Sequence, residues 1–519
     1  MSSRTRETLV NARVNLFFYF LSLVLSFFSR KIFLLTLGDN FVGLTTTLYN
    51  LLSFLNLAEI GIGAAVGYLL YQPIFEKNQN VINEIISVFG YLYRWVGYII
   101  LIAGIILSLF LPFIFSDTEF SLAVIYFAYF SFLTSSLIGY FINYRQTLLS
   151  ADQKNYIITA YFQSTYVIKT IIQMVVVHYT RNYYAWILIE LCFGFIYSFI
   201  LNHKINKVYP WLKSEIESGR QLLKKYPQVL KITKQVFVHK IATLLQFRAT
   251  PFLVYAFVSL ETVAFYTNYT IITEKLKSLI VSFLGSTFAG VGNLIAEGET
   301  AKILKVYWEL MSIRFYVTLV CTFSLYYLMP LFIELWIGET YLMSNSILYG
   351  VLIIFALNML RETTDQFISG YGMYNDVWSP IAESVIFLIC SVIGGSIWGL
   401  EGVLLGSIVS LITIIHIWKP YFLFRDGFKL PVKTYWKEIF KYILLSVVTI
   451  IIFDKLHYII NVYPKNLNWV NLIFYSSYIM LFISVLLLIS FYLGTQGMKD
   501  FTSRVIHILR GKSFGKNKL

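Results

Sequence analysis

Ionisable residues lie inside long apolar segments of this sequence, where a lipid environment makes an isolated charge costly. The basic ones are Arg30, Lys31, Arg94, Lys169, Lys240, Arg248, Lys275, Lys277, Arg314 and Arg361, and the acidic ones are Glu59, Glu190, Glu274, Glu362, Asp365 and Glu383. A lysine or arginine at the centre of a transmembrane helix costs about 2.5–3.5 kcal/mol on the insertion scale. Ten such side chains facing lipid would cost roughly 25–35 kcal/mol, more than the net stability of most folds. They must therefore reach the membrane surface, pair with acids or line a water-filled space.

Basic residues outnumber acidic residues in this set, which favours an anionic substrate. Arginine binds phosphate through two parallel hydrogen bonds, and lysine binds it as a point charge. We therefore predict a cationic cavity that binds phosphate, lined by Arg30, Lys31, Lys169, Arg248, Lys277, Arg314 and Arg361. Arg30, Lys169 and Arg248 are the strongest candidates, because they lie well inside their segments with no acidic residue close by in the sequence.

Structural roles for some of these charges remain open. Asp365 follows Arg361 by four residues and Lys277 follows Glu274 by three, so each pair shares a helix face and can neutralise itself. Side chains near the predicted cytoplasmic ends can extend to the membrane surface; these are Arg94, Lys240 and Arg314. Glu59 and Asp365 are the candidates for coupling to a proton or sodium gradient, unless they serve as partners of nearby basic groups.

The segments that position these charges predict an all-α, polytopic membrane protein. Of 519 residues, 58% are hydrophobic and only 13% are charged, whereas soluble domains are about a quarter charged. Fourteen membrane segments are predicted, at about 14–37, 42–70, 88–115, 120–144, 157–178, 183–201, 235–258, 262–293, 309–335, 347–370, 379–398, 401–418, 438–454 and 471–494. The first is too long for a cleavable signal peptide, so we expect it to remain as a helix. The three cysteines fall inside apolar segments without metal-binding spacing, and we expect neither a metal nor a disulfide.

The net charge of +14 reflects loops on one side of the membrane and does not indicate nucleic-acid binding. Almost all basic loop residues belong to that side, and only Arg181, Lys455 and Lys465 fall on the other. Because cytoplasmic loops are enriched in lysine and arginine, both termini are predicted to be cytoplasmic.

The longest cytoplasmic loop divides the predicted helices into parts. Residues 1–201 form an N-terminal six-helix bundle, and 235–418 a second bundle of the same orientation. Residues 202–234 form a linker, in which the stretch from Trp211 is predicted to be a basic amphipathic helix lying on the cytoplasmic surface. Residues 419–519 add two transmembrane helices and a basic tail.

The first two segments also carry a family pattern: Ser29-Arg30, Leu37-Gly38 and Gly43-Leu44, then LAEIGIGA from Leu57 to Ala64. This pattern and the layout of the helices resemble the Wzx-type polysaccharide flippases of the multidrug/oligosaccharidyl-lipid/polysaccharide (MOP) exporter superfamily. The resemblance implies an alternating-access transporter with a fold like that of the multidrug exporters and with no cofactor. Its implied cargo is undecaprenyl-pyrophosphate-linked oligosaccharide, moved across the bacterial cytoplasmic membrane with a proton or sodium gradient. A polysaccharide polymerase and other assembly proteins are the implied partners. Relatives often carry an acid where Arg248 lies, which leaves its role open.

Three other functions compete with this one. A lipid II flippase shares the fold and mechanism, and a drug exporter of the same superfamily would favour a net acidic cavity. A membrane-embedded glycosyltransferase or polymerase would carry a sizeable external loop, but the largest predicted one spans only about 455–468. The sequence has no Walker motif, HExxH motif or serine nucleophile elbow, so we expect a protein that is not an enzyme.

Overall fold

The computed structural model divides the chain into two compact units, residues 1–264 and 265–519, each of which is described by itself. The residues that it describes are 3–59, 62–152, 154–230, 233–234, 249–284, 291, 294–295, 298–373, 375–460, 462–464 and 466–509. The two units meet between residues 264 and 265, which is beyond the linker predicted at 202–234. The bundle boundaries drawn from the sequence therefore stay a prediction.

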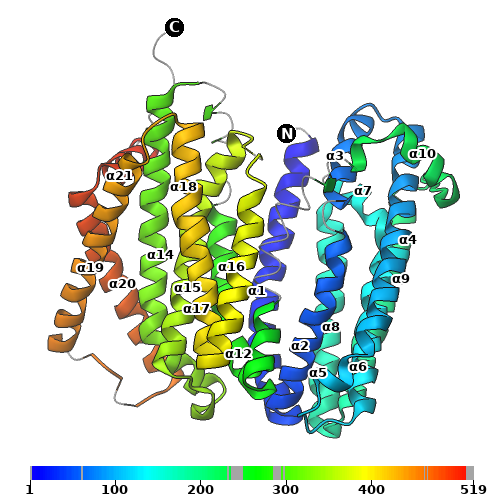
Figure 1. Cartoon of the computed structure of the whole chain (residues 1–519), viewed down its shortest axis with the longest axis horizontal. Helices are drawn as coiled ribbons and strands as arrows, with labels where there is room; N and C mark the ends of the chain where they lie inside the picture. Colours follow the sequence, from blue (N-terminus) through cyan, green and yellow to red (C-terminus); the bar gives the residue numbers. More distant parts are fainter. Residues whose placement is uncertain are drawn as a thin grey trace. The chain divides into compact units, whose positions relative to one another are not determined.

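Long helices build the N-terminal unit (Figure 1). In chain order they are α1 (Ser3–Leu37), α2 (Asp39–Leu55), α3 (Ile62–Phe75), α4 (Gln79–Ser108), α6 (Leu122–Phe141), α8 (Asn155–Thr180) and α9 (Tyr183–Val208), with the short helices α5 (Leu111–Ile114), α7 (Gln146–Ala151) and α10 (Gly219–Lys225). Residues 249–257 are also helical, and α12 (Leu260–Leu284) begins in this unit and continues into the next. Local signals set several of the ends. Gly38, with φ of 85°, separates α1 from α2, and the Asn182 side chain accepts a hydrogen bond from Ala185 N to start α9.

Helices also build the C-terminal unit. They are α14 (Thr300–Trp336), α15 (Asn345–Gly370), α16 (Trp378–Trp398), α17 (Leu400–Ser410), α18 (Lys419–Phe422), α19 (Lys433–Ile460), α20 (Trp469–Gly494) and α21 (Gln496–Leu509). The segment predicted at 401–418 ends in a π-helical stretch, Leu411–Trp418, and a second stretch, Leu423–Gly427, follows just beyond it. Such wider turns are uncommon in helices and often occur at functional sites.

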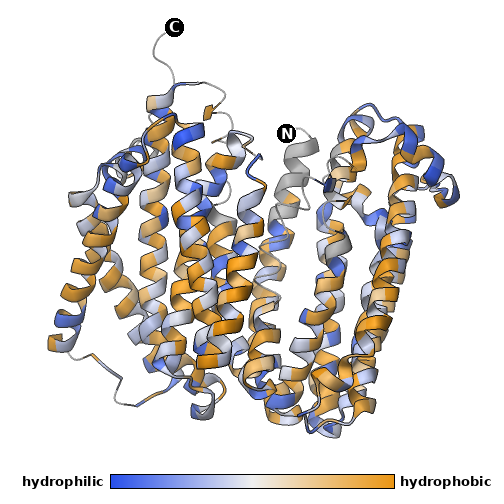
Figure 2. Cartoon of the chain, viewed as in Figure 1, coloured by the Kyte–Doolittle hydropathy of each residue, from blue (hydrophilic) through white to orange (hydrophobic). Residues whose placement is uncertain are grey.

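Ten helices among the described residues are long and apolar enough to cross a membrane. Figure 2 shows apolar residues along most of their length and polar residues gathered near the ends. Every predicted segment overlaps helical residues, the seventh only through 249–257. The second is interrupted: α2 ends at Leu55, a 3-10 turn covers Asn56–Glu59, and α3 begins at Ile62. The prediction of an all-α, polytopic membrane protein is confirmed.

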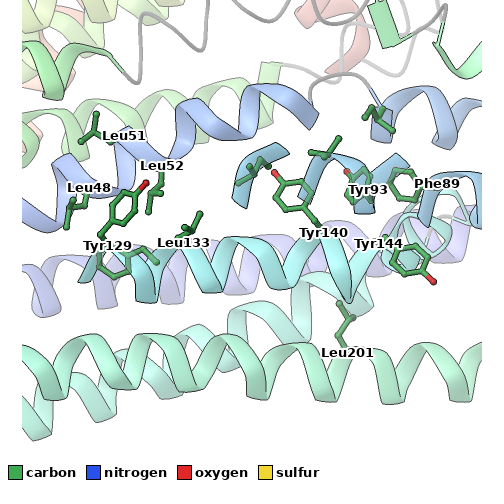
Figure 3. Close-up of a cluster of buried hydrophobic side chains, with 14 of the residues drawn as sticks. Leu48, Leu51, Leu52, Phe89, Tyr93, Tyr129, Leu133, Tyr140, Tyr144 and Leu201 are labelled. Carbon is green, nitrogen blue, oxygen red and sulfur yellow. The ribbon is translucent and has the colours of Figure 1, made fainter. Parts of the chain in front are cut away.

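Aliphatic and aromatic side chains form the packed core of the N-terminal unit. Figure 3 shows Leu48 and Leu52 of α2 close to Tyr129 and Leu133 of α6. The Tyr129 hydroxyl donates to the carbonyl oxygen of Gly104 on α4 at 2.7 Å. Because lipid tails are as apolar as leucine, close packing and such inter-helix hydrogen bonds stabilise the unit.

The predicted surface helix in the linker is wrong. Residues from Leu212 to Glu215 are not helical, Ile216–Ser218 form a 3-10 turn, and α10 ends at Lys225, two residues before Pro227. The reason is that this segment packs against α4. The amide of Glu215 donates to Ser87 Oγ at 2.9 Å, and that of Lys213 donates to Asn83 Oδ1 at 3.0 Å.

Glu84 fastens this linker to α4. Lys225 Nζ lies 2.6 Å from Glu84 Oε2, which also accepts a hydrogen bond from the Tyr226 hydroxyl. We expect Glu84→Gln to loosen the linker and speed its cleavage by protease several-fold in purified protein, because it removes the charge from both contacts. Glu217→Gln is the matched control, since Glu217 is exposed on the same linker. Equal cleavage of the two variants would contradict this role of Glu84.

Candidate functional site

A cavity of about 810 Å³ lies within the N-terminal unit. Its walls come from α2, the turn after α2, α6, the turn that follows α6, α7, α8 and α9. Aliphatic and aromatic side chains line it together with amides, hydroxyls, one lysine and one glutamate. These helices are largely apolar outside this region, so the cavity concentrates polar groups within the unit.

Lys169 and Glu190 form an ion pair in the wall of this cavity. Lys169 Nζ lies 2.6 Å from Glu190 Oε1, and the two side chains are only 14% and 15% exposed. Gln173 donates to Glu190 Oε2 at 3.1 Å. The pair forms because α8 ends at Arg181, in a left-handed conformation, and α9 returns alongside it from Tyr183. Lys169 therefore lines a cavity inside the N-terminal unit and is paired with an acid there, and its predicted place in a cationic, phosphate-binding cavity stays a prediction.

A hydrogen-bonded cluster lies where the second membrane segment breaks. Asn56 Oδ1 accepts hydrogen bonds from Ser136 Oγ at 3.1 Å and from the Tyr140 hydroxyl at 3.0 Å. Three residues later, Glu59 accepts a hydrogen bond from the Tyr93 hydroxyl. Asn56 and Ser136 line the cavity. The turn thus directs polar groups towards α4 and α6, and Glu59 is held by a tyrosine from α4.

Three of the predicted cavity residues belong to the first and seventh segments. Arg30 is half-buried on α1, and its Nη2 donates to the carbonyl oxygen of Ala264 at 2.9 Å. Lys31 is exposed on the same helix. Arg248 lies outside the described residues.

Arg361 of the C-terminal unit lies between two carboxylates. Its Nε is 2.8 Å from Asp365 Oδ2, which confirms the predicted pairing on one helix face, and its Nη1 is 3.8 Å from Glu383 Oε1 on α16. Glu383 is almost wholly buried. His416, in the π-helical stretch, has its Nε2 3.0 Å from the carbonyl oxygen of Leu357. Arg361 is therefore paired with acidic side chains, and its place in a phosphate-binding cavity stays a prediction.

Two further basic residues of this unit differ from expectation. Arg314 is 4% exposed, so it is buried and does not extend to the membrane surface. Lys419, assigned from the sequence to a loop, is also buried and lies 2.9 Å from Asp376 Oδ2. Lys277 is half-buried on α12. Within the described part of the chain, no cluster of histidine, cysteine and acidic residues could hold a metal ion.

The sequence did not reveal which acidic residues pair with the buried lysines and arginines. Glu190 was recognised only as a buried acid, although a signal for its pairing exists. Helices joined by a short turn are antiparallel neighbours, so residues at similar distances from that turn meet. Lys169 precedes the turn at Arg181 and Glu190 follows it within one helical turn of the matching distance. Glu383 has a similar signal, because Arg361 lies on α15 and the short connection at 371–377 joins α15 to α16. Asp376 has none, because its partner Lys419 lies on a later helix that no short turn joins to it.

Comparison with known proteins identifies the fold. No protein-family profile matches the sequence, and no curated protein matches it. Solved structures do match. The lipid II flippase MurJ in an inward closed conformation has a TM-score of 0.63 and 15% identity, over 93% of this chain and 99% of that chain.

Two further structures agree with that match. An inward-facing multidrug resistance MATE-family transporter of the MOP superfamily has a TM-score of 0.60 and 13% identity, over 78% of this chain and 95% of that chain. A MOP-superfamily transporter from Pyrococcus furiosus has a TM-score of 0.51 and 14% identity, over 81% of this chain and 96% of that chain. The chain therefore has the fold of the MOP-superfamily membrane transporters.

Proposed function

We propose that this protein is a flippase that moves undecaprenyl-pyrophosphate-linked oligosaccharide across the bacterial cytoplasmic membrane. The cargo would be a repeat unit of O-antigen, capsule or exopolysaccharide, and both termini would be cytoplasmic. The observation that carries the proposal is the structural match to a lipid II flippase over nearly the full length of both chains. The match to the multidrug transporter leaves about a fifth of this chain unaccounted for.

The physics of the cargo fits a polar interior. A tail of about 55 carbons cannot leave the bilayer, because each buried methylene contributes ~0.8 kcal/mol. Only the headgroup needs a hydrated path, with the tail remaining in lipid. The cavity in the N-terminal unit supplies hydroxyl and amide groups for such a path.

The charge pattern narrows the candidates for binding pyrophosphate. Lys169 and Arg361 have acidic partners and contribute little net positive charge. Arg30 and Arg248 remain the proposed phosphate ligands, with Lys31, Lys277 and Arg314 as further basic groups of the path. Glu59 and Asp365 remain the proposed groups for coupling to a proton or sodium gradient.

Deleting the gene from its own host tests the function. The deletion should abolish surface polysaccharide and trap lipid-linked precursor on the cytoplasmic side, and the wild-type gene should restore both. We expect Arg30→Ala to restore at least tenfold less, because one charge-assisted phosphate contact contributes about 1.5–3 kcal/mol. Arg30→Lys should keep part of the activity, since a point charge remains.

Lys224→Ala is the control, because Lys224 is an exposed cation on α10. Protein levels of each variant are measured in the same membranes. Equal losses for Arg30→Ala and Lys224→Ala would contradict a specific role for Arg30. Unchanged surface polysaccharide after the deletion, together with rescue of a strain depleted of its lipid II flippase, would instead identify lipid II as the cargo.

A further inference from the structure

The cavity of the N-terminal unit is rich in groups that both donate and accept hydrogen bonds. Carboxamides and hydroxyls dominate its polar surface, among them Asn56, Asn143, Gln146, Gln163, Ser135 and Ser136. Carboxamides and hydroxyls both donate and accept hydrogen bonds. They favour a polar ligand that carries several donors and acceptors.

Aromatic rings complete the wall. Tyr49 and Phe132 are stacked with their centroids 4.2 Å apart, and Phe162 and Tyr197 meet edge to face at 5.3 Å. All four line the cavity. Aromatic side chains combine an apolar ring face with, in tyrosine, a polar edge. Ring faces beside amides and hydroxyls suit a ligand with C–H surfaces and hydroxyl groups on one ring, which is the chemistry of a sugar.

The charges of the cavity argue against an anion. The only charged residues in its wall are Lys169 and Glu190, within the described chain, and they pair with each other at 2.6 Å. Lys169 Nζ also lies 5.1 Å from the centroid of the Tyr166 ring. A phosphate that approached Lys169 would meet the Glu190 carboxylate, so the wall has no surplus positive charge for it.

We propose that this cavity binds the uncharged sugar residues of the cargo and excludes its pyrophosphate. Its volume, about 810 Å³, lies within the usual range for small-molecule sites of about 300–1,000 Å³. The identification of these sugars as cargo rests on the proposed flippase function. The presence of a neutral saccharide site does not, and it is testable with soluble sugars alone.

Gly139 of α6 offers a way to fill the cavity without a clash. It lines the cavity, and no atom lies within 4 Å of the position that a Cβ would occupy. Gly139→Leu therefore places a side chain into open space and also favours the helix. Thr134→Leu is the matched control, because Thr134 is exposed on the same helix and is not part of the cavity wall.

The test uses saturation-transfer NMR on the full-length protein, purified in detergent, because this method detects weak binding of free sugars. The probes are glucose, galactose and N-acetylglucosamine, with glucuronic acid and inorganic pyrophosphate as anionic probes. We expect transfer to at least one neutral sugar, a reduction of at least fivefold in Gly139→Leu, and full retention in Thr134→Leu. Pyrophosphate should not compete.

Three results would overturn the proposal: no transfer to any neutral sugar, undiminished transfer in Gly139→Leu, or competition by pyrophosphate. The thermal stability of both variants is measured first, so that loss of binding is separated from loss of folding. Because the assay needs no transport, it also separates the two proposals. Sugar binding with no effect of gene deletion on surface polysaccharide would leave the cavity assignment intact and refute the proposed cargo.

Discussion

Replacing Gly402 with alanine should sharply reduce the amount of folded protein in the membrane. Gly402 of α17 lies against Gly394 of α16, and a Cβ at residue 402 would lie 1.9 Å from the carbonyl oxygen of Gly394. Backbone atoms cannot rotate away as a side chain does, so the two helices would have to separate. Overpacking typically costs 1–3 kcal/mol, and a clash with backbone belongs at or above the top of that range, about 3 kcal/mol or more.

Contacts next to Gly402 explain why α16 and α17 cannot move apart easily. Ser391 Oγ donates to the carbonyl oxygen of Val403 at 3.1 Å, and a Cβ at Gly406 would lie 2.4 Å from the amide nitrogen of Ser391. The two helices are thus held at close range over about one turn of each. Moving them apart at Gly402 would break the Ser391 bond and the packing around it.

The measurement is the thermal unfolding of the purified protein, with its yield from membranes. Gly67→Ala is the control, because Gly67 is also helical and has no atom within 4 Å of its Cβ position. Alanine there should be neutral or stabilise by up to about 1 kcal/mol, since glycine is a poor helix former. Equal stability of Gly402→Ala and Gly67→Ala would refute the close approach of α16 and α17.

The sequence predicts helices better than their interruptions because apolar length alone makes a membrane helix. Composition could not show that the second segment breaks at Asn56–Glu59, since the polar side chains there are satisfied by Tyr140 and Tyr93 from other helices. The linker was misjudged for a related reason. Its basic, amphipathic pattern indicates a surface helix, but bonds to α4 decide its backbone.

The candidate site was harder to predict, because a charge count ignores partners that lie on other helices. Lys169 was counted as a cation of the cavity, yet it pairs with Glu190 on the next helix. The sequence indicates that Lys419 is a loop cation, but its side chain is buried and paired with Asp376. The cavity itself had no sequence signal: amides, hydroxyls and rings are scattered over four separate stretches, and only packing gathers them.

Removing the charge of Arg361 should strongly destabilise the protein. Removing the charge of Glu383 as well should restore much of the lost stability. Arg361→Met leaves the Glu383 carboxylate, whose side chain is only 4% exposed, without its cationic partner. Breaking a buried ion pair by removing one member typically destabilises a protein by about 3–5 kcal/mol. Arg361→Met with Glu383→Leu removes both charges, and replacing a buried pair with apolar residues is often nearly neutral. Asp365 needs no third change, because it loses the arginine in both variants and the difference between them reports on Glu383.

Thermal unfolding of the single and double variants measures this coupling as a double-mutant cycle. Arg94→Met is the control, because Arg94 is exposed on α4 and removing its charge should change stability little. A double variant no more stable than Arg361→Met would show that the loss does not come from the orphaned Glu383 carboxylate. Recovered stability would show that Arg361 and Glu383 are structural partners.

The coupling role of Asp365 is tested with Asp365→Asn, once the stability of this variant is known. If Asp365→Asn keeps full gradient-dependent transport, Asp365 has no coupling role and acts only on the position of Arg361.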